Sequence, residues 1–193
     1  MKAYSFVESG CDEEVDEIYL NIKNTFGVTF VPNFFKVLAH HKFLLQGVWN
    51  CYEKVLASGD LPLQVKEVIF LYTALENGCN YCSSTHLAVC DMLEFGEDNI
   101  LALKNDIDKI RPKELQAVLS LVKKVLHAPE SINKNDYHEL SVMGFSDSEV
   151  AEMLCMIHLA KTAVRIALMN GLSDIEPEIS EYLKNNSLST GIA

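Results

Sequence analysis

The residue types best suited to chemistry are gathered in one short stretch of the sequence, between Glu76 and His86. Two cysteines three positions apart, Cys79 and Cys82, stand in its middle, and His86 follows the second cysteine by four positions. Cysteines at this spacing can close a disulfide when they flank the first turn of a helix. There the helix dipole and free backbone N–H groups favour the thiolate and lower its pKa. The pair therefore predicts thiol and disulfide redox chemistry, with a lowered pKa at Cys82.

A proton acceptor and a carboxylate accompany this pair. His86 would share a helix face with Cys82, so its imidazole can hold or relay the proton that a thiol loses. Glu67 lies in an otherwise apolar helical segment, where a charge is more often paired or functional than idle. Glu76, one turn before the pair, is interpreted as a solvated surface carboxylate. We therefore expect Glu67 to orient His86, and we keep Glu76 as the second candidate.

Three other interpretations of the cysteine pair can be weighed. A structural zinc site needs four ligands, and Cys79, Cys82, His86 and Cys90 strung along one helix would not converge on a tetrahedral ion. A thioredoxin-type motif needs alternating strands and helices around it, and these are missing. The third interpretation is a pair of buried, inert cysteines. We favour redox chemistry over all three.

The elements that must position these residues are helices, because strand signals are nearly absent. Asp12 is expected to cap the first helix, and Ser146 with Glu149 forms a capping box at the start of the longest one. Asn77-Gly78 is a left-handed stop signal just before the cysteine pair. The 193-residue chain is therefore predicted to form a single all-α domain. Helices are expected near residues 12–27, 32–57, 62–77, 80–96, 99–106, 112–127, 134–143, 146–170 and 176–184.

The composition disfavours several classes of function. Sixteen basic against 27 acidic residues give a formal charge of −11, which leaves no basic stripe for nucleic acid and disfavours an anionic membrane surface. No apolar run approaches the roughly 20 residues that span a bilayer, and the N-terminal residues lack the apolar stretch of a secretory signal. We therefore expect a cytoplasmic protein. The four scattered cysteines are expected to be buried small hydrophobes: Cys11, Cys51, Cys90 and Cys155.

The candidate residues also form a longer pattern: Glu67, eleven intervening residues, and then Cys79-x-x-Cys82-x-x-x-His86. This pattern resembles the signature of the alkylhydroperoxidase D-like branch of the carboxymuconolactone decarboxylase superfamily. The likeness covers roughly residues 32–172, most of the chain. The spaced glutamate, cysteine and histidine pattern is fairly specific, whereas two cysteines alone would not be.

The resemblance implies an alkylhydroperoxidase D-like helical bundle with thiol peroxidase or disulfide reductase activity. It implies that Cys82 attacks the hydroperoxide, that Cys79 resolves the product, and that His86 with Glu67 relays the proton. Tyr81 stands where some relatives hold a histidine, and a phenol titrates poorly at neutral pH, which weakens it as a member of the relay. No metal, haem or flavin is expected. An external dithiol, either a lipoyl domain or thioredoxin, would restore the pair.

Two rival functions stay open. One is a lactone enzyme of the carboxymuconolactone decarboxylase type, in which His86 and Glu67 do acid–base work and the cysteines are incidental. The other is a non-enzymatic helical module whose disulfide senses redox state and switches an interface. The lactone decarboxylases of the superfamily lack the cysteine pair, so its presence here favours redox chemistry.

The resemblance also implies assembly into a homotrimer or a hexamer. The segment 32–57 carries more apolar side chains than one core-facing stripe requires. We therefore expect part of this segment, including Trp49, to lie at a subunit interface.

Overall fold

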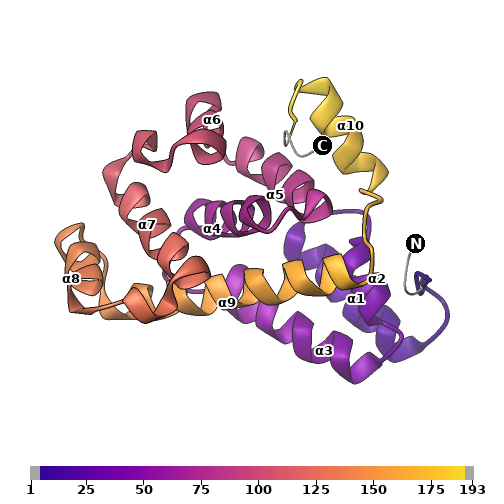
Figure 1. Cartoon of the computed structure of the whole chain (residues 1–193). Coiled ribbons are helices and arrows are strands. Elements are labelled where there is room, and N and C mark those ends of the chain that lie inside the picture. Colours follow the sequence, from indigo (N-terminus) through magenta and orange to yellow (C-terminus); the bar gives the residue numbers. More distant parts are fainter. Residues whose placement is uncertain (1–4, 190–193) are drawn as a thin grey trace.

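The computed structural model describes residues 5–189, and within that range the chain forms helices joined by short turns, with no β-strand (Figure 1). The all-α prediction is confirmed. The α-helices are α1 (Glu13–Phe26), α2 (Asn33–Leu38), α3 (Lys42–Cys51), α4 (Leu63–Glu76), α5 (Asn80–Met92), α6 (Glu97–Asn105), α7 (Lys113–His127), α8 (Lys134–Val142), α9 (Asp147–Met169) and α10 (Pro177–Asn185). Three shorter turns are the π-helical η1 (Tyr52–Leu56) and the 3-10 helices η2 (Ile107–Lys109) and η3 (Pro129–Ser131).

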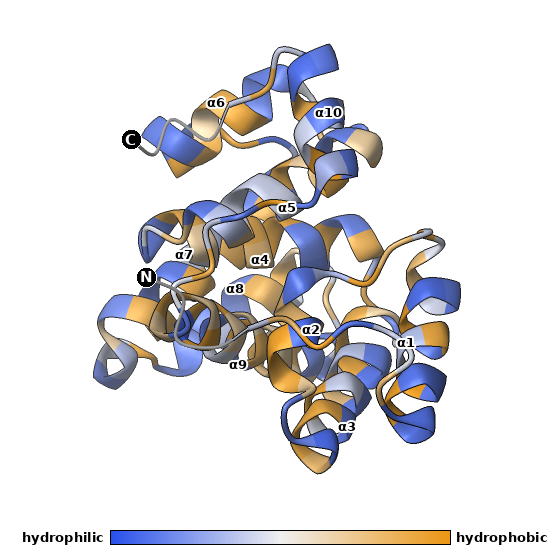
Figure 2. Cartoon of the chain, turned by 90° about the vertical axis from the view of Figure 1, so that its right-hand side faces the viewer, coloured by the Kyte–Doolittle hydropathy of each residue, from blue (hydrophilic) through white to orange (hydrophobic). Residues whose placement is uncertain are grey.

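Helix α4 lies at the centre of the molecule, with α5 and α9 packed along it (Figure 1). Every residue from Lys66 to Ala74 on this helix is buried. A helix that is apolar on all sides belongs in the interior rather than at the surface, and Figure 2 shows the hydrophobic side of the surrounding helices turned inward. Glu67 is therefore carried into the core by the helix on which it lies.

The helix boundaries follow the local signals in the sequence. The carboxylate of Asp12 accepts the N–H groups of Glu14 and Val15 at the start of α1. Ser146 and Glu149 form the predicted capping box at the start of α9. These caps satisfy backbone N–H groups that a helix leaves without partners, so they fix where each helix begins.

The expected helix over residues 32–57 is wrong as a single element. The chain breaks after α2, where His41 adopts an extended conformation and its ring nitrogen accepts the N–H of Leu44 at 3.3 Å. Helix α3 starts there and ends in η1. The side chain of Trp49 is 1% exposed, so it belongs to the core and not to a surface, whereas Phe43 is 73% exposed.

The scattered cysteines also differ from expectation. Only Cys90 is buried, whereas Cys11, Cys51 and Cys155 are exposed. Each exposed cysteine lies on the outer side of its segment, and a side chain this small leaves little apolar area in water. Helix α5 also ends before Gly96, at Met92, because Glu94 adopts a left-handed conformation with a φ of 59° and the N–H of Phe95 bonds back to the carbonyl of Cys90.

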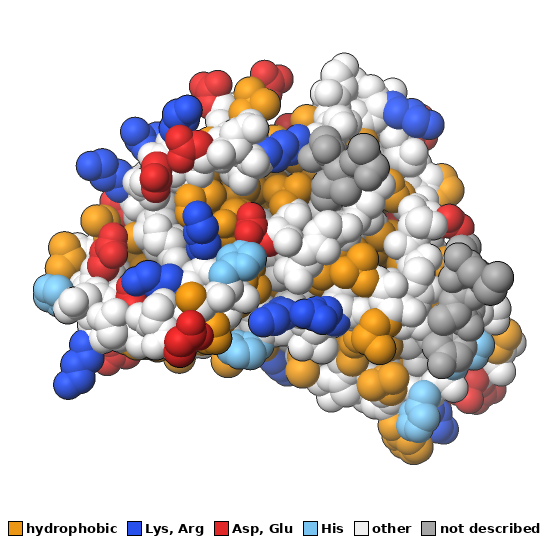
Figure 3. Space-filling model, viewed as in Figure 1, with side chains coloured by type: hydrophobic (Ala, Val, Ile, Leu, Met, Phe, Trp, Pro, Cys, Tyr) orange, Lys and Arg blue, Asp and Glu red, His pale blue; other side chains and the backbone are white. Residues whose placement is uncertain are grey.

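The outer surface is charged. On the face drawn in Figure 3, acidic and basic side chains are intermingled over the side that carries α7 and α8. One such pair joins Lys124 of α7 to Asp136 of α8. Among residues 5–189, no helix has both the length and the apolar character needed to cross a bilayer.

Candidate active site

A tight turn between α4 and α5 brings the cysteine pair to the start of α5. Gly78 has a φ of 65°, a left-handed conformation that glycine adopts without strain. Cys79 is then the N-cap of α5, and its sulfur accepts the backbone N–H of Cys82 at 3.4 Å. The predicted position of the two cysteines on the first turn of a helix is confirmed.

The two thiols lie side by side in the interior. Their Sγ atoms are 2.8 Å apart, and neither forms a disulfide. Cys79 is 1% exposed and Cys82 is 4% exposed. At this separation the two sulfurs can share a proton, and a small displacement would bring them to the bonding distance of a disulfide, about 2.05 Å.

The pKa values of the two thiols are shifted in opposite directions. The hydrogen bond with Cys82 lowers the pKa of Cys79, and the backbone N–H groups of Tyr81 and Cys82 lower it further against the effect of burial. The hydrogen bond with Cys79 and burial both raise the pKa of Cys82. The expected lowering at Cys82 is therefore wrong for the resting dithiol. Cys79 takes the first negative charge mainly because its sulfur is hydrogen-bonded to Cys82, and the backbone N–H groups at the N-cap position add to this effect.

Titration of the thiols should reveal this division. We expect one thiolate to form below the usual thiol range and to be assigned to Cys79 by its loss in Cys79→Ser. In Cys82→Ala the titration midpoint of Cys79 should move upward, because the hydrogen bond with Cys82, the main cause of its lowered pKa, is gone. As the pH falls, the Cys79 thiolate of this variant should therefore be protonated at a higher pH than in the wild type. Ultraviolet thiolate absorbance across pH measures both, with Cys155→Ala as an exposed control that leaves the midpoint unchanged. An unmoved midpoint in Cys82→Ala would contradict the shared proton.

A carboxylate and an imidazole form a buried pair behind the cysteines. The Nδ1 atom of His86 lies 2.6 Å from Oε2 of Glu67, and the two side chains are almost fully buried. The ring of Phe70 stacks on the imidazole with centroids 3.6 Å apart, which holds its plane. The carboxylate fixes the orientation of the ring, as second partners of functional histidines do. Within residues 5–189, His86 makes no hydrogen bond to either sulfur.

The other two candidates face elsewhere. Glu76 pairs with His127 of α7 at 2.5 Å on a partly exposed surface, so it does not join the buried pair. The hydroxyl of Tyr81 donates to Oε1 of Glu176 at 2.8 Å and accepts the N–H of Phe34 at 3.2 Å. Burial and the Glu176 carboxylate raise the pKa of Tyr81 well above its usual value. The Tyr81 phenol is therefore engaged with Glu176 and not with the cysteines.

Two buried polar residues near the pair were not found from the sequence. Glu176, the N-cap of α10, also accepts the N–H of Asn33 at 2.5 Å and so ties the C-terminal helix to α2 and α5. Tyr52 of η1 is 6% exposed, and burial, followed by the charges of Cys82, Glu67 and Cys79, raises the pKa of Tyr52 well above its usual value. No local pattern marks either residue, because their partners lie far away in the sequence.

A second buried charge fixes the start of α4. Lys66 is 1% exposed and pairs with Glu152 of α9. The Glu152 carboxylate also accepts the N–H groups of Asp60 and Leu61, at 2.8 and 3.0 Å. A buried charge costs several kcal/mol unless it is paired and hydrogen-bonded. This network therefore holds the register of α4, and with it the position of Glu67.

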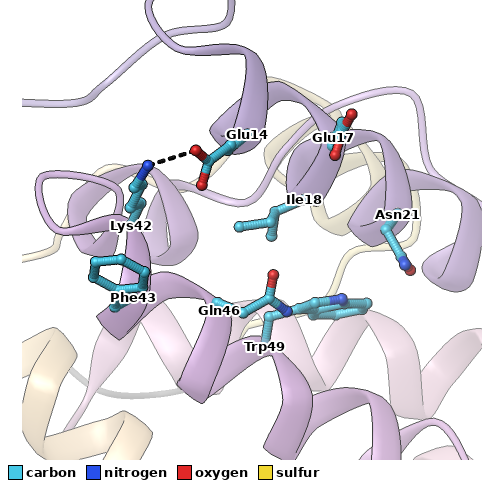
Figure 4. Close-up of a pocket in the computed structure, with 8 residues that line it drawn as sticks. All are labelled: Glu14, Glu17, Ile18, Asn21, Lys42, Phe43, Gln46 and Trp49. Carbon is cyan, nitrogen blue, oxygen red and sulfur yellow. Dashed lines mark hydrogen bonds and ion pairs between the residues drawn. The ribbon is translucent and has the colours of Figure 1, made fainter.

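Two open cavities lie apart from the cysteines. One of about 310 Å³ lies between α1 and α3, where Lys42 pairs with Glu14 at 2.6 Å beside Gln46 and Trp49 (Figure 4). Another, of about 540 Å³, is lined by α4, α6 and α7 and contains Glu76. Neither is lined by Cys79 or Cys82.

The arrangement of helices around this site is that of the alkylhydroperoxidase AhpD core. A scan against protein-family models finds no match, and neither does a search of curated protein sequences. Solved structures do match. A peroxidase-related protein with the AhpD core from Ralstonia eutropha JMP134 aligns with a TM-score of 0.82 at 23% identity, covering 94% of this chain and 95% of its own.

Two further structures share the fold. A peroxidase-related protein from Silicibacter sp. TM1040 aligns with a TM-score of 0.80 at 18% identity, over 92% of this chain and 93% of its own. A cysteine-to-alanine variant of the debrominase Bmp8, solved with 2,3,4-tribromopyrrole, aligns with a TM-score of 0.75 at 15% identity. The alignment covers 96% of this chain and 99% of the debrominase chain. At these identities the comparisons establish the AhpD-like fold, over nearly the full length of each chain.

Proposed function

We propose that this protein is a thiol-dependent peroxidase that reduces hydroperoxides through a Cys79–Cys82 dithiol and disulfide cycle. The observation that carries the proposal is the pair of buried thiols 2.8 Å apart on the same helical hairpin as the buried Glu67–His86 pair. Two proteins with this fold are described as peroxidase-related, which supports the proposal.

The proposed cycle begins when the proton of Cys82 passes to His86, whose positive charge Glu67 stabilises. The sulfur then attacks the terminal peroxide oxygen, so that an S–O bond forms, the O–O bond breaks, and the leaving oxygen takes the proton and departs as alcohol or water. Cys79 displaces water from the sulfenic acid to form the disulfide. An external dithiol reduces that disulfide by exchange and is itself oxidised.

The assignment of attack to Cys82 rests on position rather than on resting charge. Cys82 precedes His86 by one helical turn, so the two residues lie on the same face of α5. Cys79 holds the negative charge of the resting pair, with its sulfur 2.8 Å from that of Cys82, so it is ready to attack the sulfenic acid that forms on Cys82. The donor in this proposal is a lipoyl domain or thioredoxin, and the assembly is a trimer or hexamer.

Peroxide consumption in the presence of different dithiol donors tests the proposal. We expect catalytic loss of hydrogen peroxide and tert-butyl hydroperoxide with dihydrolipoamide or reduced thioredoxin, and no turnover once the reduced protein has been alkylated. The same alkylated protein, offered γ-carboxymuconolactone, separates the rival lactone enzyme, which needs no thiol. Failure to consume either peroxide with any donor would refute the peroxidase.

A second candidate is reductive dehalogenation of an aromatic ring, because a debrominase has this fold and aromatic side chains surround the site. Phe70 stacks on His86, and the ring of Tyr52 lies 6.2 Å from Phe70. Two thiols can supply the two electrons that replace a carbon–bromine bond by carbon–hydrogen, with release of bromide and formation of the disulfide. Bromide release from 2,3,4-tribromopyrrole in the same assay distinguishes this activity from peroxide reduction.

A further inference from the structure

The turn that carries the cysteine pair is held by the segment that joins α9 to α10. This segment passes the start of α5 (Figure 1), and Glu176 at its end accepts the hydroxyl of Tyr81 at 2.8 Å. The oxygen of the same hydroxyl accepts the N–H of Phe34 at 3.2 Å. Tyr81 is 4% exposed, so burial fixes its side chain together with these two bonds. The residue that precedes Cys82 is therefore anchored to parts of the chain that are far away in the sequence.

The anchor is a buried carboxylate. Glu176 is 3% exposed, and its Oε1 atom accepts the backbone N–H of Asn33 at 2.5 Å as well as the hydroxyl of Tyr81. Its Oε2 atom is buried and has no hydrogen-bond partner among residues 5–189. A buried polar atom without a partner costs free energy, and an uncharged cap such as serine would serve the start of α10. The contacts that use the carboxylate are those to Tyr81 and Asn33, so its role lies in joining α10 to α5 and α2.

The position of Tyr81 bears directly on the sulfur of Cys79. The peptide unit between Tyr81 and Cys82 is planar, so the Tyr81 carbonyl and the Cys82 N–H move together. That N–H is donated to the Cys79 sulfur at 3.4 Å, and the carbonyl accepts the hydroxyl of Thr85 at 3.0 Å. A displacement of Tyr81 would therefore turn the N–H away from the sulfur. The pKa of Cys79 agrees with this geometry, because it is lowered by the hydrogen bond with Cys82 and further by the backbone N–H groups of Cys82 and Tyr81.

We propose that Glu176 and Tyr81 are positioning residues, which hold the N–H of Cys82 on the sulfur of Cys79 and so stabilise the thiolate of the reduced pair. This inference rests on the dithiol and disulfide cycle of the proposed function. In regeneration the external dithiol gives up two electrons and two protons, its own sulfurs join, and the Cys79–Cys82 bond breaks. One of the protons passes to water when Cys79 stays ionised. A stabilised thiolate favours the reduced pair over the disulfide, so the two residues set how readily the pair is regenerated.

Replacing Tyr81 by phenylalanine tests this role because it removes the hydroxyl and keeps the packed ring. We expect the titration midpoint of Cys79 to rise by about one pH unit, which is comparable to the loss of one N–H bond to a charged group. This tenfold loss of thiolate stabilisation should make the disulfide harder to reduce by about 30 mV. Ultraviolet thiolate absorbance measures the midpoint, and equilibration with mixtures of dihydrolipoamide and lipoamide measures the potential.

Tyr182→Phe is the matched control. The hydroxyl of Tyr182 on α10 donates to Asp91 on α5 at 2.8 Å, so this variant also removes one hydrogen bond between α10 and α5 but leaves the cysteine turn intact. Its midpoint and its potential should equal those of the wild type.

Variants of Glu176 test the other end of the link. Glu176→Gln keeps an oxygen that can accept the bonds from Tyr81 and Asn33, so it should not raise the midpoint of Cys79. Glu176→Ala removes that oxygen and should raise the midpoint as Tyr81→Phe does. If Glu176 acts through Tyr81, the double variant Glu176→Ala/Tyr81→Phe should show no further rise, because the effects of residues that act together do not add.

The pH dependence of the potential separates positioning from a structural effect. At a pH above the Cys79 midpoints of both proteins, the difference of about 30 mV should be fully present. Well below both midpoints Cys79 is a neutral thiol in both proteins, so the difference should vanish. A strained disulfide or a loosened core would change the potential at every pH. The other titratable groups around the pair are the same in both proteins and contribute equally: Cys82, Glu67, His86 and Tyr52.

These measurements need no peroxide, so they separate this role from the proposed function. A wild-type protein that consumes no peroxide, with the expected shifts in Tyr81→Phe, would refute the peroxidase and leave the positioning role standing. An unmoved midpoint in Tyr81→Phe and in Glu176→Ala would overturn the role of both residues, whether or not the protein reduces peroxides. A potential difference that is the same at every pH, or an equal shift in Tyr182→Phe, would overturn it as well.

Discussion

Cys82→Ser should abolish catalytic peroxide consumption, and Cys79→Ser should consume one equivalent of peroxide and then stop. A serine hydroxyl cannot supply the polarisable thiolate that attacks peroxide oxygen, so the loss at position 82 should reach on the order of 1000-fold or more, as for other nucleophiles. Without Cys79 the sulfenic acid still forms but is not resolved. Single-turnover peroxide consumption and the mass of the product measure both results.

The Cys79→Ser variant is well suited to this test because serine is a good N-cap, so the start of α5 is preserved. Cys155→Ser removes an exposed cysteine and should keep the full rate. The reverse pattern, a single equivalent consumed by Cys82→Ser and none by Cys79→Ser, would transfer the attack to Cys79. That outcome would mean that the resting charge on Cys79 decides which sulfur reacts.

Glu67→Gln should slow peroxide turnover by about 100-fold, in the range of general acid–base contributions. The amide keeps the shape and the burial of Glu67 but removes the charge that stabilises the protonated ring of His86, 2.6 Å away. Glu76→Gln is the matched control. Its partner His127 is half exposed, and such surface pairs are worth about 0–1 kcal/mol, so turnover should be unchanged. Steady-state kinetics of the two variants, with thermal unfolding to verify folding, measure the difference.

The pair can also be tested as a unit. If Glu67 acts only through His86, the double variant Glu67→Gln/His86→Gln should lose no more activity than His86→Gln alone, because contributions of residues that act together do not add. Additive losses would assign Glu67 a separate role at the sulfur. Equal losses in Glu67→Gln and Glu76→Gln would contradict the choice of carboxylate.

Much of the fold and part of the site could be predicted from the sequence, because the signals are local. The caps at Asp12 and at Ser146 act over two or three residues, so they locate helix starts without tertiary information. The same holds for the turn at Gly78 and for the placement of Cys79 and Cys82 on the first turn of α5. The distance between Glu67 and His86 follows from two helices and one turn, which is why their spacing pointed correctly to a contact.

Features that depend on residues far apart in the sequence could not be predicted and became visible only in the folded chain. The helix expected over residues 32–57 breaks at His41, because the His41 ring caps the start of α3 by accepting the N–H of Leu44. The spacing of apolar residues does not reveal such a cap. The engagement of Tyr81 depends on Glu176, 95 positions later in the chain.

The distribution of charge within the cysteine pair was likewise a property of the folded site. The spacing of the residues was enough to predict that two thiols share the start of a helix with a histidine one turn further on. Which sulfur holds the charge depends on the direction of their mutual hydrogen bond, on the N–H groups around the N-cap, and on burial at each sulfur. Those quantities exist only once α4 and α5 have packed together, because desolvation and hydrogen-bond geometry are set by neighbours in space rather than in sequence.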